Sequence, residues 1–339
     1  MDTQQRNIVL DMMKGIGILL MMLCHLVYAD GPIKQFIYSF HMPLFFIIAG
    51  YLAKDLTDNS QYAQFTIKNA KRLLLPYAVT MLMLCAWGGV QAFAKQDISY
   101  FLRHLFSMLS ASADGWDSPW GLIYAGPMWF LIALFVAKDI FGALQLALNR
   151  LQVKYKDELL LSVCIILSVI AVITRPFIPS LPFCIMQAFA ALAFYAVGWY
   201  VYKHPVPWWV YGLCVITWPV AIIYGGVELE SAYLDYYPLS VIGACGGTYV
   251  VYLLCKGMDK LHSYSMFHIS NIPSPLAWCG MYSLPILCCH ELEMYSDIIY
   301  SLKYRYPSVD ILPGKGEIGI AIILAAIVIH IPYLKKVYQ

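Results

Sequence analysis

Charged residues are scarce in this sequence: aspartate, glutamate, lysine and arginine together make up 12% of its 339 residues. A soluble domain carries about 25%. Long polar stretches are also missing, so no segment is a candidate for an attached soluble domain. The net charge is only +2 and no long basic run occurs, so nothing in the charge pattern indicates nucleic-acid binding.

Signals of several other protein classes are missing as well. The ten cysteines lie almost entirely within apolar runs, without the spacing of a zinc site and without indicating a disulfide scaffold. The first apolar segment follows a polar heptad and ends without a small-residue cleavage site, so we expect no cleavable signal peptide. The inverted repeats that are typical of many transporters are not found.

Hydrophobic residues, in contrast, make up 61% of the chain. Apolar runs of about 20 residues, the length that crosses a bilayer, recur from end to end. They predict an all-α, polytopic membrane helix bundle that forms one domain over residues 1–339. The ten predicted transmembrane helices are 8–28, 34–53, 73–94, 127–147, 158–174, 183–201, 207–224, 237–255, 276–291 and 317–334.

The basic residues predict the orientation of this bundle, because lysine and arginine collect in cytoplasmic loops. With the amino terminus inside, 15 of the 22 fall inside and 7 outside. We therefore expect both termini in the cytoplasm. Two outer segments are long, 95–126 and 292–316. The first is rich in aromatic residues, glycine, proline and acids, which fits either an interfacial aromatic belt or a carbohydrate site.

Three ionisable residues share one stripe of the first predicted helix. Lys14 and His25 are 11 positions apart, which places them on the same face, roughly 16 Å apart along the axis. Asp11 has the spacing of an ion pair with Lys14, and Gly15 leaves room for a neighbouring helix. Ionisable residues inside a membrane mark functional sites by default. The structural alternative is a locking ion pair, with His25 bonded to a neighbouring helix.

Two more histidines are predicted at a depth similar to that of His25. His41 opens the second predicted helix and His290 ends the ninth, both near the outer side. Three histidines at one level suit a metal site or a catalytic base with polar neighbours. Taken singly, His41 and His290 are equally consistent with interfacial residues.

A basic cluster stands at the inner end of the third predicted helix, in TIKNAKRLLLPYAV. It consists of Lys68, Lys71 and Arg72. Positive-inside anchoring explains such a cluster, and so does phosphate binding. Together with Lys14, it would form a basic mouth to a path that ends at His25.

The sequence resembles the membrane acyltransferase-3 family, particularly its fucose 4-O-acetylase-like branch, nearly from end to end. The resemblance is carried by RNIVLDMMKGIGILLMMLCH, FHMPLFFIIAGYL, KRLLLPY, GPMWFLIALF, AFYAVGWY and SLPILCCH. It implies a bundle of about ten helices in a bacterial plasma membrane. It also implies transfer of an acyl group, usually acetyl from cytoplasmic acetyl-CoA, to hydroxyls of cell-surface sugars, polysaccharides or lipid-linked glycans.

The resemblance also implies roles for single residues. His25 would serve at the acyl-transfer centre, Lys14 would replace the usual arginine, and the cluster Lys68, Lys71 and Arg72 would bind CoA. The chain departs from the family pattern at Ala49, where serine is common, and at Tyr282, where asparagine is frequent. Lysines also stand where paired arginines are usual, which weakens bidentate phosphate recognition.

The two interpretations together predict a buried CoA tunnel. His25 would act as general base or as an acyl relay, and Asp11 would position Lys14. The acceptor would enter near the outer side, and no metal is expected. The predicted acceptor-side residues are His41, Tyr51, Trp129 and His290, with His41 or Tyr51 as a candidate oxyanion donor.

Three competing functions remain at this point. A proton-coupled transporter or flippase of a glycan precursor would use Asp11, Lys14 and His25 as a proton relay. The missing repeat and the basic inner mouth argue against it. A non-catalytic membrane sensor would tolerate replacement of His25. A metal enzyme would use His25, His41 and His290.

Overall fold

The computed structural model describes residues 7–26, 31–113, 124–151, 153–179, 181–264, 274–295 and 315–338. Within these ranges the chain is helical apart from connections and one short β-hairpin. Seven segments are long and apolar enough to cross a membrane, and two shorter apolar helices accompany them. The prediction of an all-α polytopic membrane protein is therefore confirmed. Residues 114–123 and 296–314, in the two long segments predicted outside, lie beyond the described residues.

Each predicted transmembrane range overlaps at least one helix among the described residues, and seven helical segments reach the length that crosses a membrane. The α-helices are α1 (Ile8–Leu26), α2 (Pro32–Tyr38), α3 (His41–Tyr51), α4 (Asn59–Asn69), α5 (Leu75–Lys95), α6 (Ser99–Ser110), α7 (Trp129–Arg150), α8 (Lys156–Thr174), α9 (Ile185–Lys203), α10 (Trp208–Tyr224), α11 (Tyr237–Tyr264), α12 (Pro275–Met281), α13 (Ser283–Tyr295), α15 (Lys315–Val328) and α16 (Pro332–Tyr338). Two 3₁₀ turns, Gly126–Met128 and Pro182–Cys184, and a π turn, Ala70–Leu74, adjoin them. Strand β1 (Gly226–Glu228) pairs antiparallel with β2 (Tyr233–Asp235). Helix α6 was not predicted.

Three predicted helices are broken in the structure, each at a proline. Predicted helix 34–53 divides into α2 and α3, and predicted helix 276–291 divides into α12 and α13. Pro43 and Pro285 have no amide proton to bond the carbonyl four residues earlier, which lies at each break. Predicted helix 317–334 ends shortly before Pro332, as helices usually do before proline.

The third predicted helix begins earlier than residue 73. Helix α4 passes directly into the π turn and then into α5, so one helical segment runs from Asn59 to Lys95. Pro76 removes the hydrogen bond to the carbonyl of Arg72, inside the π turn. Such π turns are rare in proteins, and those that occur often lie at functional sites. Here the turn carries two of the predicted CoA-binding residues, Lys71 and Arg72.

Glycines allow two pairs of helices to meet backbone to backbone. A Cβ added at Gly280 of α12 would lie 1.6 Å from the carbonyl oxygen of Asp11 in α1. A Cβ at Gly15 would lie 2.0 Å from the carbonyl oxygen of Leu276. Gly50 and Gly198 create the corresponding contact between α3 and α9. Small residues favour such close helix pairs in membranes. The prediction that Gly15 leaves room for a neighbour is confirmed.

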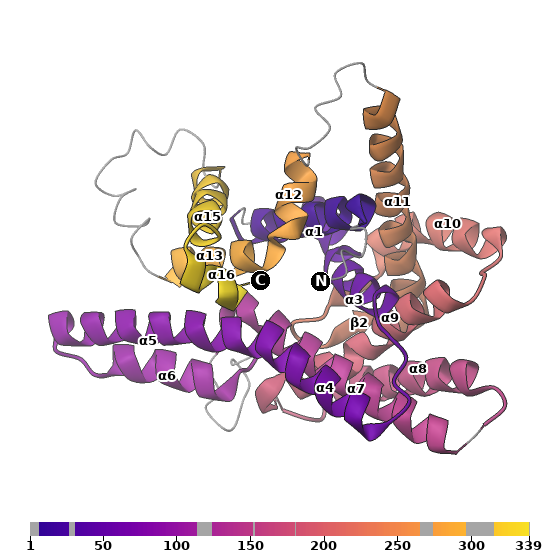
Figure 1. Cartoon of the computed structure of the whole chain (residues 1–339), viewed down its shortest axis with the longest axis horizontal. Helices are drawn as coiled ribbons and strands as arrows, with labels where there is room; N and C mark the ends of the chain where they lie inside the picture. The colour runs from indigo at the N-terminus through magenta and orange to yellow at the C-terminus, as the bar shows by residue number, and fades with distance from the viewer. Residues whose placement is uncertain are drawn as a thin grey trace.

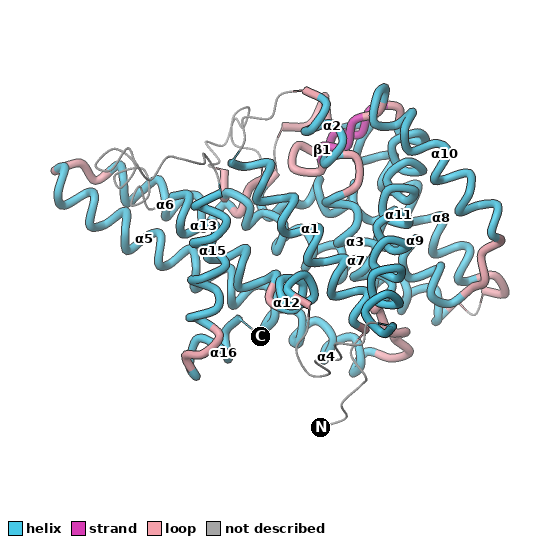
Figure 2. Tube along the Cα trace, turned by 90° about the horizontal axis from the view of Figure 1, so that it is seen from above, coloured by secondary structure: helices cyan, strands magenta, loops and turns pink. Residues whose placement is uncertain are grey.

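The bundle has two opposite faces that matter for function. In Figure 1, α5 and α6 lie side by side and extend away from the rest. Figure 2 shows α2 and β1 at one edge and α4 at the other. We call these edges the hairpin face (Pro32–Tyr38 and Gly226–Asp235) and the α4 face (Asn59–Asn69). Helix α1 runs from the α4 face towards the hairpin face, because its end leads into α2.

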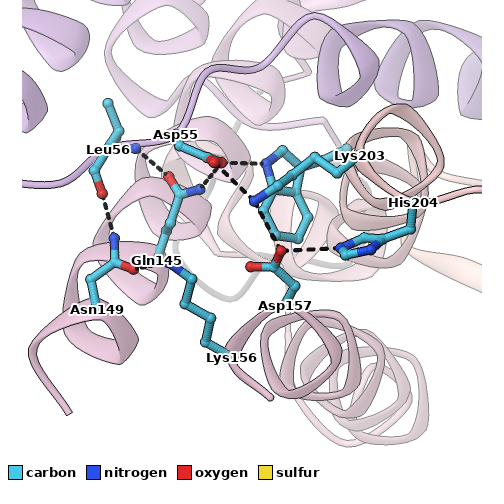
Figure 3. A network of polar contacts seen from close by, with 9 residues as sticks. Asp55, Leu56, Gln145, Asn149, Lys156, Asp157, Lys203 and His204 are labelled. Atoms are coloured by element: carbon cyan, nitrogen blue, oxygen red, sulfur yellow. Dashed lines mark hydrogen bonds and ion pairs between the residues drawn. The ribbon is translucent and has the colours of Figure 1, made fainter. Parts of the chain in front are cut away.

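A polar network joins the α3–α4 connection to α7, α8 and α9 (Figure 3). Asp55 accepts hydrogen bonds from Gln145 Nε2 at 2.8 Å, Trp199 Nε1 at 3.1 Å and Lys203 Nζ at 2.8 Å. Lys203 Nζ also lies 2.9 Å from Asp157 Oδ2. A single carboxylate therefore connects three donors from two helices.

Replacing Asp55 with alanine is expected to destabilise the protein. Gln145 and Trp199 would lose this acceptor while Lys203 would keep Asp157, and leaving a buried donor unpaired costs about 1–3 kcal/mol. The free energy of unfolding of purified protein in detergent measures this loss. Asp259→Ala on α11, outside the network, is the control. Equal stability of the two variants would show that the network does not hold the helices together.

Candidate functional site

A cavity of about 240 Å³ lies among α1, α3, α7, α13 and the β-hairpin. It brings together residues that are far apart in the sequence. The predicted site residues that line it are Lys14, His25, His41, Arg72 and Trp129. Much of the remaining wall is apolar, with Met21, Phe45 and Phe130 among its side chains.

Two of the three ionisable residues of the α1 stripe, Lys14 and His25, line this cavity. Lys14 Nζ lies 2.6 Å from Asp11 Oδ1, so the expected ion pair is present. Asp11 is buried and does not line the cavity, whereas Lys14 does. The carboxylate therefore acts on the cavity through Lys14. His25 lies 11 residues further along α1, towards the hairpin face.

The structure places the two other candidate histidines differently. His41 lines the cavity and its Nδ1 lies 2.9 Å from the carbonyl oxygen of Ile37. A carbonyl only accepts, so Nδ1 carries the proton and Nε2 of the neutral ring is an acceptor. His290 is buried behind the wall, with its ring centroid 5.8 Å from that of His25. His290 is not among the residues that line the cavity, and its place on the acceptor side stays a prediction.

His290 is held by an acid on its own helix. Its Nδ1 lies 3.2 Å from Glu293 Oε2, one turn further along α13. A carboxylate fixes the orientation of the ring that donates to it. Within the described part of the chain, no group of three or more His, Cys, Asp or Glu residues is arranged to hold a metal ion. Nothing in this geometry supports the three histidines as a metal site.

Three other predicted residues lie outside the cavity wall. Tyr51 packs against Tyr202 with ring centroids 5.0 Å apart and is not among the residues that line the cavity. One residue of rotation, about 100°, separates it from Leu52, which does line the cavity. Lys68, Lys71 and Arg72 are all exposed. Of the basic cluster, Arg72 alone lines the cavity.

The cavity also contains polar residues that the sequence analysis did not select. They are Tyr38 from α2, Lys138 from α7, Glu230 from the hairpin turn and Ser283 from α13. Lys138 had a usable signal, because it is a lysine inside an apolar helix. Glu230 had none, because only the tertiary structure places the hairpin beside α2.

The charges of the wall are separated along the cavity. Lys14 lies in the first half of α1, and Arg72 lies in the π turn directly after α4. Glu230 comes from the hairpin face and interacts electrostatically with Tyr38. A cationic end suits phosphate groups, which lysine and arginine bind by charge-assisted hydrogen bonds. An imidazole between the two ends suits proton transfer.

Comparison with known proteins agrees with this chemistry. A family model described as an acyltransferase domain matches residues 7–334. Nodulation protein NolL of Sinorhizobium fredii is 30% identical over 151 residues, which are 42% of this chain and 38% of that protein. Nodulation protein NolL of Mesorhizobium japonicum is 28% identical over 216 residues, 61% of this chain and 50% of that protein.

The matches thus span half or less of the length of these two relatives. No solved structure matches the chain. The family match, in contrast, extends over almost all of the sequence and includes every residue that lines the cavity. The chain belongs to the acyltransferase-3 family of membrane acyltransferases.

Proposed function

We propose that this protein moves an acetyl or other short acyl group from cytoplasmic acyl-CoA to a hydroxyl of a cell-surface sugar, polysaccharide or lipid-linked glycan. Membership of the family supports acyl transfer. The observation that carries the choice of donor is one cavity lined by Lys14 and Arg72 together with His25, which lies 11 residues after Lys14 on α1. CoA has the same order of groups, with phosphates at one end and a thioester at the other.

The proposal places the α4 face in the cytoplasm of a bacterial plasma membrane. This orientation puts the larger share of lysine and arginine inside, with both chain termini. Acyl-CoA then enters past the exposed Lys68 and Lys71 and threads towards His25. The acceptor enters from the hairpin face, where Trp129 and His41 line the cavity. Aromatic rings such as that of Trp129 offer a flat apolar surface to a sugar.

The proposed chemical step uses His25 as a general base. Its neutral imidazole takes the proton of the acceptor hydroxyl while the oxygen attacks the thioester carbonyl. The tetrahedral intermediate collapses to the ester, and the CoA sulfur leaves with the proton from the imidazolium. Such catalysis contributes about 100- to 10,000-fold. In the alternative relay, the imidazole attacks the thioester first and CoA leaves before the acceptor reacts.

Titration of acetyl-CoA into the purified protein tests the donor assignment. We expect the wild type to bind and Arg72→Ala to bind at least 10-fold more weakly, because hydrogen bonds to charged groups contribute about 1.5–3 kcal/mol. Isothermal titration calorimetry gives both dissociation constants. Lys95→Ala, at the opposite end of the same helical segment, is the matched control. A wild type that binds no acyl-CoA would contradict the proposal and favour the transporter.

A further inference from the structure

Lys138 is a cation in the middle of a membrane-spanning helix. It lines the cavity from α7, nine residues after Trp129, or about 13 Å along the helix axis. A charged side chain at such a position is costly and usually lies on the path of a substrate or an ion. The proposed mechanism above gives Lys138 no role.

The neighbours of Lys138 increase this cost. It interacts electrostatically with Arg72 and Lys68, which carry the same sign of charge. No described carboxylate is paired with any of these three cations. The nearest compensating contact that the structure shows is the Phe65 ring, whose centroid lies 5.7 Å from Lys138 Nζ. A contact of this kind contributes only about 0.5–2 kcal/mol.

The structure holds the three cations together despite their repulsion. Asp139, next to Lys138, accepts hydrogen bonds from Tyr62 at 2.9 Å and from Thr66 at 2.5 Å. These bonds fasten α4 to α7 beside the cavity. The π turn then carries Arg72 into the cavity wall. Specific contacts therefore hold α4, the π turn and α7 beside the cavity.

We propose that Lys138 and Arg72 bind a diphosphate inside the cavity. Two cations match the two charges of a diphosphate diester. On the proposed function, on which this assignment of the ligand rests, the group is the diphosphate of acyl-CoA. The exposed Lys68 and Lys71 then meet the 3′-phosphate of its adenosine at the α4 face. The pantetheine arm extends from Lys138 towards His25, along the apolar wall.

Four probes separate these phosphate contacts: CoA, 3′-dephospho-CoA, pantetheine and inorganic pyrophosphate. Binding of each to the full-length protein in lipid nanodiscs is measured by calorimetry. Lys138→Met is expected to lower the affinity for CoA and for 3′-dephospho-CoA by the same factor, about 10-fold or more. The same variant should lower the affinity for pyrophosphate and leave the affinity for pantetheine unchanged. Lys71→Met should lower the affinity for CoA and leave the affinity for 3′-dephospho-CoA unchanged. Lys138→Arg should restore most of the lost affinity.

The controls keep folding apart from binding. Lys154→Met, an exposed lysine between α7 and α8, should bind all probes as the wild type does. The ligand-free Lys138→Met protein should melt no lower than the wild type, because the variant removes repulsion. Should that variant still fail to fold, Lys138→Gln and Lys138→Arg provide the same comparison with a polar and with a charged side chain.

Two results would overturn the inference. One is an unchanged affinity of the Lys138 variants for CoA and pyrophosphate. The other is an equal loss for pantetheine, which would mean that Lys138 supports packing only. Wild-type protein that binds pyrophosphate through Lys138 but does not bind CoA would keep the diphosphate site and contradict acyl-CoA as the donor. Protein that binds neither would contradict both.

Discussion

Replacement of His25 by glutamine is expected to lower acyl transfer by about 100- to 10,000-fold, the usual contribution of a general base. Glutamine keeps a polar side chain in the cavity wall but does not take up the hydroxyl proton. The affinity for CoA should stay within about two-fold of the wild type, since Lys14 and Arg72 are intact. Release of CoA thiol in the presence of an acceptor glycan measures turnover, and calorimetry measures the affinity.

His330→Gln is the matched control for this experiment, because His330 is exposed near the end of α15 and bonds only the local carbonyl of Ala326 among the described residues. It should transfer acyl groups at the wild-type rate. Full turnover by the His25→Gln protein would contradict the role of the imidazole as a base and as a relay. Equal losses in both histidine variants would indicate a general effect on the bundle.

Gly280→Ala is expected to destabilise the protein by about 3 kcal/mol or more, at the upper end of the cost of overpacking. The added methyl group would lie 1.6 Å from the carbonyl oxygen of Asp11. Both atoms belong to backbone, so only separation of α1 and α12 removes the clash. Separation would displace the Asp11–Lys14 ion pair, so we also expect weaker CoA binding. Thermal unfolding in detergent measures the first effect.

Gly257→Ala in α11 provides the control, because a Cβ there meets nothing within 4 Å among the described residues. Alanine favours helix over glycine by about 0.8–1.0 kcal/mol, so this variant should be at least as stable as the wild type. A Gly280→Ala protein that unfolds at the wild-type temperature would show that α1 and α12 need not lie so close.

The helix ends show where sequence patterns were insufficient. Hydropathy identified the apolar ranges of the seven spanning segments and the two shorter apolar helices, because a segment that enters lipid must satisfy its backbone internally and therefore forms a helix. It could not show that Pro43 and Pro285 break their helices, since neighbouring helices decide whether a proline kinks or ends a membrane helix. It also missed the polar helix α4 before residue 73, which carries no apolar signal.

The stripe on α1 could be predicted from the sequence because it depends on one helix only. A spacing of 11 residues determines that Lys14 and His25 share a face, whatever packs around them. The partner of His25 could not be predicted from the sequence. His290 and His41 were both expected on the acceptor side, yet His41 lines the cavity and His290 lies behind the wall. That difference depends on how α3 and α13 are rotated against α1.

By itself, the sequence determined that the chain is a membrane helix bundle of this acyltransferase family, with an ionisable stripe on its first helix. These properties follow from hydropathy, helical periodicity and local motifs. Only the tertiary structure decided which charges share a cavity. It brought Lys138 beside Arg72, placed Glu230 at the opposite end and left Tyr51 outside. The reason is physical: packing between helices is set by contacts such as the glycine crossings and the Asp139 bonds, which join residues far apart in the chain.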